Sequence, residues 1–175
     1  MAALDRLNSV VKRIESQVAS AGWYSTSKYP DGTQVATVAV TQEYGAGFIP
    51  TRPFFRPAIA LNKKKWADIA KDGMTKAIRG DIQPDMALNR IALTIEGDIR
   101  EAINNVFEPP LSDLTLALRQ KRQNGVEITR SVVNKTMREI AAGTAIFSSN
   151  TKPLNDTGYM LASLSSHFGD KNEFE

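Results

Sequence analysis

The sequence predicts an α+β fold, in which several amphipathic helices pack on a small antiparallel sheet within a single domain. Apolar residues recur at steps of three and four over long segments, most clearly between Pro84 and Pro109, which is the pattern of amphipathic helices. Aromatic and hydroxyl residues alternate from Trp23 to Tyr29, as in a short strand. The 175 residues correspond to one domain at about 150 residues per domain.

The N-terminal part of the chain is expected to hold two helices separated by the strand and a turn. Apolar residues spaced three or four apart predict a helix over residues 2–21, which Gly22 ends. Residues 29–32 have the proline and glycine of a tight turn. Residues 33–45 are ambiguous, because their branched side chains favour a strand while their apolar spacing fits a helix. We prefer the helix, with Thr33 as its N-cap and Gly45 just beyond its end.

Prolines, phenylalanines and arginines crowd into residues 48–59. Each proline fixes its own φ and pushes the preceding residue toward extended geometry, so this segment is expected to be a stiff joint. Pro57 fits the first turn of a helix that runs to about Ile78. The buried face of that helix is predicted to consist of Ile59, Trp66, Ile69, Ala70 and Ala77.

The next helix begins at Pro84 and ends before Pro109 and Pro110, which forbid its continuation. Gly97 in its middle costs about 1 kcal/mol relative to alanine, so it is expected to serve a close helix contact or a bend. The apolar stripe of this helix is formed by Leu88, Ile91, Ile95, Ile99, Ala102 and Val106.

Two shorter helices and a loop are predicted to follow. Ser112 caps a helix that runs to about Lys121, and residues 128–142 form a further, weaker one. Residues 148–153 have the composition of a loop. We interpret residues 123–152 as an extended arm or an inserted segment.

The C-terminal part is expected to contain one short helix and a tail. Asp156 is placed to cap the helix, which would direct Met160, Leu161 and Leu164 toward the core. Residues 166–175 are interpreted as a flexible tail. The charge there reverses sign, with three acids against one lysine from residue 170 onward.

Composition excludes most classes of enzyme and of membrane protein. The chain has no cysteine and one histidine, so disulfides, thiol catalysis, zinc sites built on these residues and a histidine-dependent triad all lack their parts. Gly45-Ala46-Gly47 has neither the context of a dinucleotide site nor the lysine of a P-loop. No apolar run approaches the roughly 20 residues that cross a bilayer, and the N-terminus does not resemble a secretory signal. We therefore expect a non-enzymatic protein without cofactor, made in the cytoplasm.

The net charge of +3 is less informative than its distribution. Residues 51–80 contain eight basic residues and two acids, and residues 119–138 contain six basic residues and one acid. Each run is either a solvated helix face, which we favour, or a contact with a polyanion or an acidic partner. Aromatic residues lie beside basic ones at 54–56 and 65–66. We expect these aromatic side chains to pack in the core rather than to stack on nucleic-acid bases. The candidates for contact with DNA or an acidic partner are Lys63, Lys64, Lys65, Arg119, Lys121 and Arg122.

Four sequence blocks resemble a family of tailed-bacteriophage virion proteins, the tail-completion or minor tail and neck proteins. They occur in the expected order, span residues 29 to 166, and cover most of the chain; residues 123–150 depart from the pattern by their length. The first block matches at Asp31, Gly32, Val35, Ala36, Ala39, Glu43, Tyr44 and Gly45. The second matches at Pro50, Arg52, Pro53, Phe54, Arg56 and Pro57. The third matches at Pro110, Leu111, Ser112 and Thr115. The fourth matches at Pro153, Leu154, Asp156, Thr157, Gly158, Leu161 and Ser163, with Leu161 displaced by one position.

The resemblance implies a structural virion protein that forms a ring of identical subunits, with a hexamer favoured, at the joint between head and tail. Its partners would be other copies of itself, the neighbouring neck, tail-terminator or tail-tube proteins, and the genomic DNA in the channel. Interface or joint roles fall on Arg52, Phe54, Phe55, Arg56, Asp156, Thr157 and Gly158. Arg52 and Arg56 are expected to serve assembly more than the fold. The alternative hypothesis is a cytoplasmic nucleic-acid-binding module that uses the basic helix faces.

Overall fold

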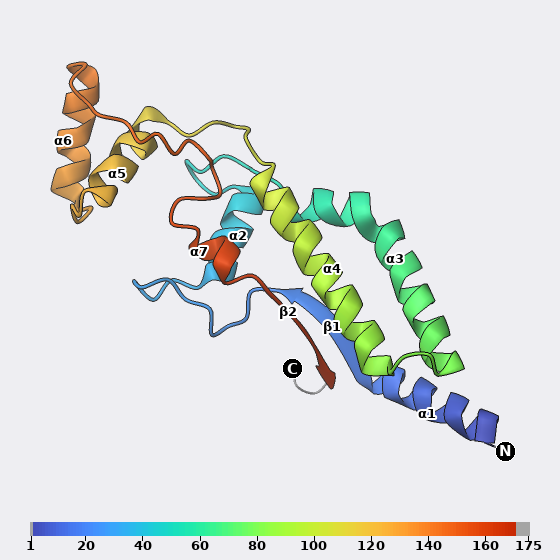
Figure 1. Cartoon of the computed structure of the whole chain (residues 1–175). Coiled ribbons are helices and arrows are strands. Elements are labelled where there is room, and N and C mark those ends of the chain that lie inside the picture. The colour runs from blue at the N-terminus through green and yellow to red at the C-terminus, as the bar shows by residue number, and fades with distance from the viewer. Residues whose placement is uncertain (1, 171–175) are drawn as a thin grey trace.

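The computed structural model describes residues 2–170 and has seven helices and two strands in that range, in an α+β arrangement within one domain (Figure 1). The elements in chain order are α1 Ala2–Ser16, β1 Gln17–Gly22, α2 Val35–Tyr44, α3 Phe55–Arg79, α4 Pro84–Asn104, α5 Asp113–Gln123, α6 Arg130–Ala141, α7 Tyr159–Ala162 and β2 Ser165–Asp170.

Helix α4 lies at the centre of the molecule. It packs along α3 on one side and contacts both strands of the sheet on the other (Figure 1). Its predicted apolar stripe is confirmed, since Leu88, Ile91 and Ile99 are buried, and Pro84 begins the helix as expected. The prediction for α3 holds for its bounds but fails for Ile59, which is 40% exposed, while its neighbour Ala58 is buried. The rest of the predicted face holds, because Ala77 is buried and Trp66, Ile69 and Ala70 are partly buried.

The two strands form an antiparallel ribbon in which Gln17 pairs with Asp170 and Gly22 with Ser165. A small antiparallel sheet was predicted and is present, but the one strand predicted with bounds, residues 23–29, was placed wrongly. The helix predicted over residues 2–21 ends at Ser16, and its last part is β1. The predicted strand over residues 23–29 is a loop containing a turn.

The predicted flexible tail, residues 166–175, is also corrected in part. Residues 166–170 belong to β2, and residues 171–175 lie outside the described part of the chain. Both strands consist mainly of small and polar residues with weak intrinsic preference for a strand. These two segments therefore become strands because they pair with each other and because α4 packs against them, rather than because of local propensity.

The core joins α2, α4, the joint at residues 48–57 and the C-terminal segment. Phe54 is 2% exposed and meets the edge of the Trp23 ring at a centroid distance of 6.0 Å. The indole N–H of Trp23 donates to the carbonyl of Met160 at 2.8 Å. The buried members of this core are Val35, Ala39, Phe54, Ile99, Ile103, Leu154, Met160 and Leu164. The preference for core packing of Phe54 over base stacking is thus confirmed.

Helices α5 and α6 form a helical hairpin that projects from the rest of the chain, which we call the body (Figure 1). The hydroxyl of Ser112 accepts from the backbone N–H of Thr115 and caps α5, as predicted. The hydroxyl of Thr129 caps α6 in the same way. Residues 123–152, interpreted as an arm or insertion, hold α6 between two loops. No described helix is both long and apolar enough to span a membrane.

Two helical glycines give opposite predictions for substitution by alanine. A Cβ on Gly97 would have no heavy atom within 4 Å, so its expected role in a close helix contact is wrong. A Cβ on Gly73 would lie 3.0 Å from the Cβ of Ala87, at the crossing of α3 and α4.

Gly97→Ala is expected to raise the free energy of unfolding by about 0.5–1 kcal/mol, because alanine is the better helix former. Gly73→Ala has the same gain in propensity but must push α3 from α4, so it should be at least about 1 kcal/mol less stable than Gly97→Ala. Urea unfolding of both variants measures this difference. Equal stabilisation by the two substitutions would contradict the close approach at Gly73.

Candidate functional site

A groove with a volume of about 1020 Å³ lies between the α5–α6 hairpin and the body. Its walls come from the turn at residues 29–33, α2, the joint at residues 48–52, α5 with the segment before it, and residues 153–160. We call it the joint groove and define it by its apolar lining residues Val38, Phe48, Ile49, Leu111, Leu118 and Tyr159.

The buried carboxylate of Glu43 holds the joint onto the end of α2. Its two oxygens accept hydrogen bonds from the backbone N–H groups of Phe54, Phe55 and Arg56 at 2.7, 2.9 and 3.1 Å. The side-chain Nε of Arg56 donates to it at 2.9 Å. Glu43 therefore caps the N-terminus of α3 from another helix, where the free N–H groups and the helix dipole favour an anion.

Gly45 makes the turn from α2 into the joint possible. It has φ +74°, and a Cβ there would lie 2.9 Å from the hydroxyl oxygen of Thr51 and 3.0 Å from the carbonyl oxygen of Ile49. A side chain at this position is therefore excluded both by backbone conformation and by space.

Burial raises the pKa of Glu43, but hydrogen bonds from Phe55, Arg56 and Phe54 outweigh burial and leave this pKa below its ordinary value. A lowered pKa in the folded state means that the unfolded chain binds the proton more tightly. Glu43 therefore stabilises the fold above the ordinary glutamate pKa of about 4.3, and this stabilisation is lost as the pH falls through the lower folded value.

Glu43→Gln is expected to lower the free energy of unfolding at pH 7 by about 1–3 kcal/mol, because it replaces an anion that accepts four hydrogen bonds. The difference between the two proteins should shrink as the pH falls below about 4.3. Denaturant unfolding at several pH values between 7 and 3 measures it. A difference that stays constant over this range would show that the charge of Glu43 contributes nothing.

Arg52 fixes the joint to the segment that leads into α5. Its side chain is buried, and its Nε and one terminal nitrogen donate to the carbonyls of Pro109 and Pro110 at 2.9 and 3.1 Å. The other terminal nitrogen donates to the side-chain oxygen of Gln42 at 3.3 Å. Burial lowers the pKa of Arg52, although a guanidinium stays charged in proteins. All of these partners lie within the chain, so Arg52 has a structural role in the joint.

Arg56 differs from Arg52 in that its side chain is half exposed. It pairs with Glu43 and lies over the ring of Tyr44, 4.5 Å from the ring centroid. Phe55 is partly buried and meets the edge of Phe54. Of the two joint arginines, Arg56 alone presents a surface to a partner.

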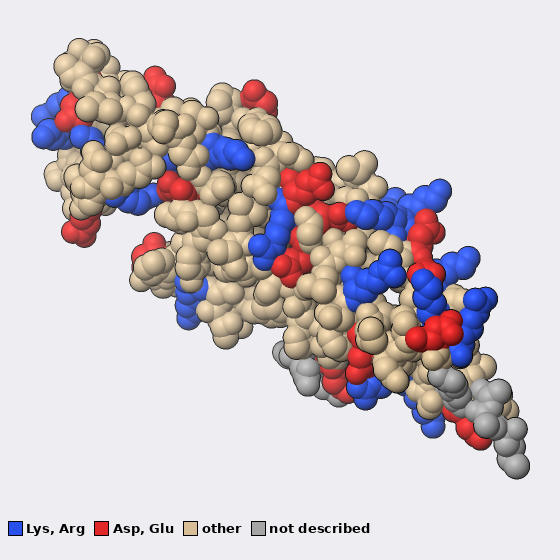
Figure 2. Space-filling model, in the orientation of Figure 1, with Lys and Arg blue, Asp and Glu red and all other residues tan. Residues whose placement is uncertain are grey.

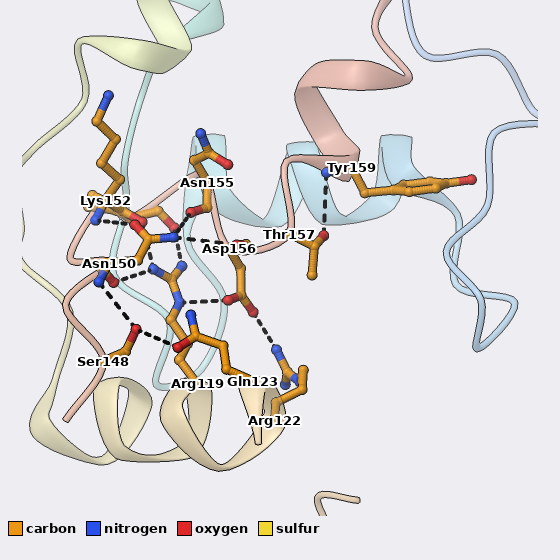
Figure 3. A network of polar contacts seen from close by, with 11 residues as sticks. Arg119, Arg122, Gln123, Ser148, Asn150, Lys152, Asn155, Asp156, Thr157 and Tyr159 are labelled. Atoms are coloured by element: carbon orange, nitrogen blue, oxygen red, sulfur yellow. Dashed lines mark hydrogen bonds and ion pairs between the residues drawn. The ribbon is translucent and has the colours of Figure 1, made fainter. Parts of the chain in front are cut away.

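Arg119 binds the loop segment that leads from α6 back to the body (Figure 3). It is 5% exposed, and its terminal nitrogens donate to the carbonyls of Asn150, Lys152 and Pro153 at 3.0, 2.8 and 3.3 Å. Its Nε lies 3.2 Å from a carboxylate oxygen of Asp156. Burial lowers the pKa of Arg119, and Asp156 opposes that effect. The expected contact of Arg119 with DNA or an acidic partner is therefore wrong.

Asp156 bridges two arginines of α5, because its second oxygen pairs with Arg122 (Figure 3). The prediction that Asp156 caps α7 is wrong. Gly158, with φ +75°, occupies the cap position, and the hydroxyl of Thr157 accepts from the N–H of Tyr159 at 3.3 Å. Lys121 pairs with Glu139 of α6 at 2.7 Å, so it joins the two helices of the hairpin.

Two tyrosines line the groove beside this network. The rings of Tyr29 and Tyr159 lie against each other at a centroid distance of 5.1 Å. Burial raises the pKa of Tyr29, and the charges of Asp156 and Asp31 add to that effect.

The lysines of α3 form a separate surface. Lys63 and Lys64 are exposed, whereas Lys65 pairs with Asp98 of α4 at 2.6 Å. The indole N–H of Trp66 donates to the other oxygen of Asp98 at 2.6 Å. Figure 2 shows Lys and Arg side chains along the α3 side of the body and again at the tip of the hairpin.

Sequence reasoning missed the structural roles of Glu43 and Arg119. Glu43 appeared only as one member of a motif, and Arg119 as part of a basic run. Their partners lie 11 to 13 and 31 to 37 residues away, and most of them are backbone atoms, which side-chain patterns do not reveal. Among residues 2–170, no group of three or more His, Cys, Asp or Glu residues is placed to hold a metal ion.

Three comparisons with known proteins gave no match. Neither the protein-family models nor the curated proteins and solved structures that were compared gave one.

Proposed function

We propose that this chain is a structural protein of a tailed-bacteriophage particle, a tail-completion or neck component that forms a ring at the joint between head and tail. One observation supports this most strongly. The four sequence blocks on which the resemblance rests occupy three separated stretches of the chain, residues 31–57, 110–115 and 153–163, and all contribute to the lining of the joint groove. Each block supplies part of its lining, through Asp31, Arg52, Ser112 and Asp156 among others.

The contacts between these blocks give the pattern a physical meaning. Glu43 of the first block binds the backbone of the second, and Arg52 of the second binds a carbonyl of the third. Arg119, four residues beyond the end of the third block at Thr115, binds Asp156 of the fourth. Residues that contact one another are expected to occur together in a sequence pattern. The four blocks therefore correspond to one structural feature, the joint groove and the contacts around it.

The large exposed surface of the chain supports the proposal that it is a subunit of an assembly. The chain exposes 11081 Å², whereas a folded monomer of 19.2 kDa is expected to expose about 8,400 Å². The surplus of about 2,600 Å² exceeds the roughly 1,600 Å² that a ring subunit buries at two standard interfaces. Large apolar side chains are part of this surface, including Phe48, Leu61, Ile146 and Leu4.

In the proposed ring, a hexamer by preference, the partners are identical copies and the neighbouring neck, tail-terminator or tail-tube proteins. Of the six basic residues considered for DNA in the channel, Lys63 and Lys64 keep exposed side chains without an ion pair in the described part of the chain. Arg119 is buried, and the other three have carboxylate partners. The outer face of α3 is therefore the surface that we assign to DNA.

Mass spectrometry of purified particles, from lysates of cells that produce this chain, tests the proposal. The chain should be present in several copies per particle, at a constant ratio to the tail proteins. A chain found only in the soluble fraction, and absent from particles that contain their tails, would remove the virion role.

The alternative, a cytoplasmic nucleic-acid-binding module, is favoured by the same exposed lysines of α3. Binding of a DNA duplex to the purified chain at 50 and 200 mM salt distinguishes the two. Tight binding that falls by about 10³-fold over this range would support a dedicated nucleic-acid binder with several phosphate contacts. Negligible binding at physiological salt would exclude it.

A further inference from the structure

Two apolar surfaces toward opposite ends of the molecule stay exposed among residues 2–170. At one end, α1 extends beyond α3 and α4; toward the other end, the joint groove opens beneath the α5–α6 hairpin (Figure 1). An elongated subunit with unpartnered complementary surfaces at its two ends can associate head to tail with copies of itself. Such an interface is heterologous, and it closes into a ring when the rotation between neighbours divides a full turn.

Helix α1 has an exposed apolar stripe. Leu4, Leu7 and Val11 are 63%, 37% and 39% exposed, and they occupy the i, i+3 and i+7 positions of one face. Val10 is buried, and the guanidinium of Arg13 donates to both carboxylate oxygens of Asp85 at 3.0 and 2.7 Å. The base of α1 is thus anchored to the body, and the stripe faces away from this anchor.

The joint groove has the dimensions and lining for a polypeptide segment. Its volume of about 1020 Å³ lies at the upper limit of small-molecule pockets, which run from about 300 to 1,000 Å³. Phe48, fully exposed, and Ile49, 40% exposed, form part of its lining. The charged groups of Arg52 and Arg119 are already bound within the chain, so the groove offers mainly apolar surface to an occupant.

We propose that the apolar stripe of α1 occupies the joint groove of a second copy of this chain. Amphipathic helices bind apolar grooves through residues at i, i+3 and i+7, which is the spacing of Leu4, Leu7 and Val11. The surplus surface of about 2,600 Å² is large enough for this contact on both sides of each subunit, at about 800 Å² per side. The inference rests on the self-association in the proposed function, and it names the two surfaces that meet.

The absence of cysteine from the chain makes cross-linking a direct test. A variant with both Leu7→Cys and Ile49→Cys is treated with a short bis-maleimide at concentrations where sedimentation detects oligomers. Both positions are at least one-third exposed, so the melting temperature should be unchanged. A ladder of dimers, trimers and larger products is expected, since each copy then carries both halves of a heterologous contact.

The matched control combines Leu7→Cys with Leu93→Cys on α4, which is 54% exposed and lies outside the groove lining. It should give at least fivefold less trimer than the test pair. Equal ladders from the two pairs would overturn the inference, as would oligomers without the Leu7–Ile49 ladder. A chain that neither associates nor cross-links would overturn it too. None of these results decides whether the chain is present in particles, so the proposed function fails or stands by its own test.

Discussion

Replacing Arg119 by alanine is expected to lower the free energy of unfolding by about 3 kcal/mol, because it leaves buried acceptors without their donor. The carbonyls of Asn150, Lys152 and Pro153 lose their shared guanidinium, and Asp156 loses one of its two cationic partners. Lysine at this position keeps the charge but cannot reach four acceptors in one plane. Arg119→Lys should therefore recover only part of the lost stability.

Arg122→Ala is the matched control for this prediction. Arg122 also pairs with Asp156, but its side chain is half exposed, so its loss should cost less than about 1 kcal/mol. Chemical denaturation measures all three variants, and hydrogen exchange should show reduced protection near residues 150–153 in Arg119→Ala alone. Equal losses for Arg119→Ala and Arg122→Ala would contradict a special role for the buried guanidinium.

Replacing Arg52 by alanine is the second large expected effect, a loss of about 2–3 kcal/mol. The carbonyls of Pro109 and Pro110 belong to a segment whose two prolines have no N–H of their own, and Arg52 is their common donor. Without it, the chain leading into α5 is released from the joint. The free energy of unfolding and hydrogen exchange at residues 111–118 are the measurements.

Arg56→Ala serves as the comparison, because Arg56 is also a joint arginine but has a half-exposed side chain. Its loss should reduce stability by less than about 1 kcal/mol, since three backbone donors remain on Glu43. A larger loss for Arg56→Ala than for Arg52→Ala would reverse the assignment of structural and surface roles to the two arginines.

The two buried arginines have a common purpose. The α5–α6 hairpin is joined to the body by two stretches of chain; Arg52 binds the outgoing stretch, and Arg119 binds the returning one. Because the joint groove lies between the hairpin and the body, these contacts set its shape. Weakening either arginine should therefore impair both stability and any association that uses the groove.

Local patterns in the sequence predicted the helices well. The stripe of α4, the Ser112 cap of α5, the joint and the short α7 could all be predicted, because periodicity, caps and prolines act over a few residues. The α+β class was also correct. The strands could not be placed, because Gln17–Gly22 and Ser165–Asp170 are paired across almost the whole chain and neither is a strong strand sequence.

The candidate site was predicted in its residues but not in its contacts. Arg52 and Asp156 were singled out for an interface or joint role, Asp156 also as a helix cap, and Arg119 for a contact with DNA or an acidic partner. Their real partners are mostly backbone carbonyls and each other, brought together by folding. A sequence indicates that an arginine needs an acceptor, but only the fold decides whether that acceptor lies within the chain.

The most direct test of the account is electron cryomicroscopy of tailed particles from cells that produce this chain. The account predicts a ring of identical copies at the joint between head and tail, in which each joint groove holds α1 of the neighbouring copy. A neck map in which every density is accounted for by other proteins would contradict the virion role. A ring of this chain whose grooves are empty would contradict the contact between α1 and the groove.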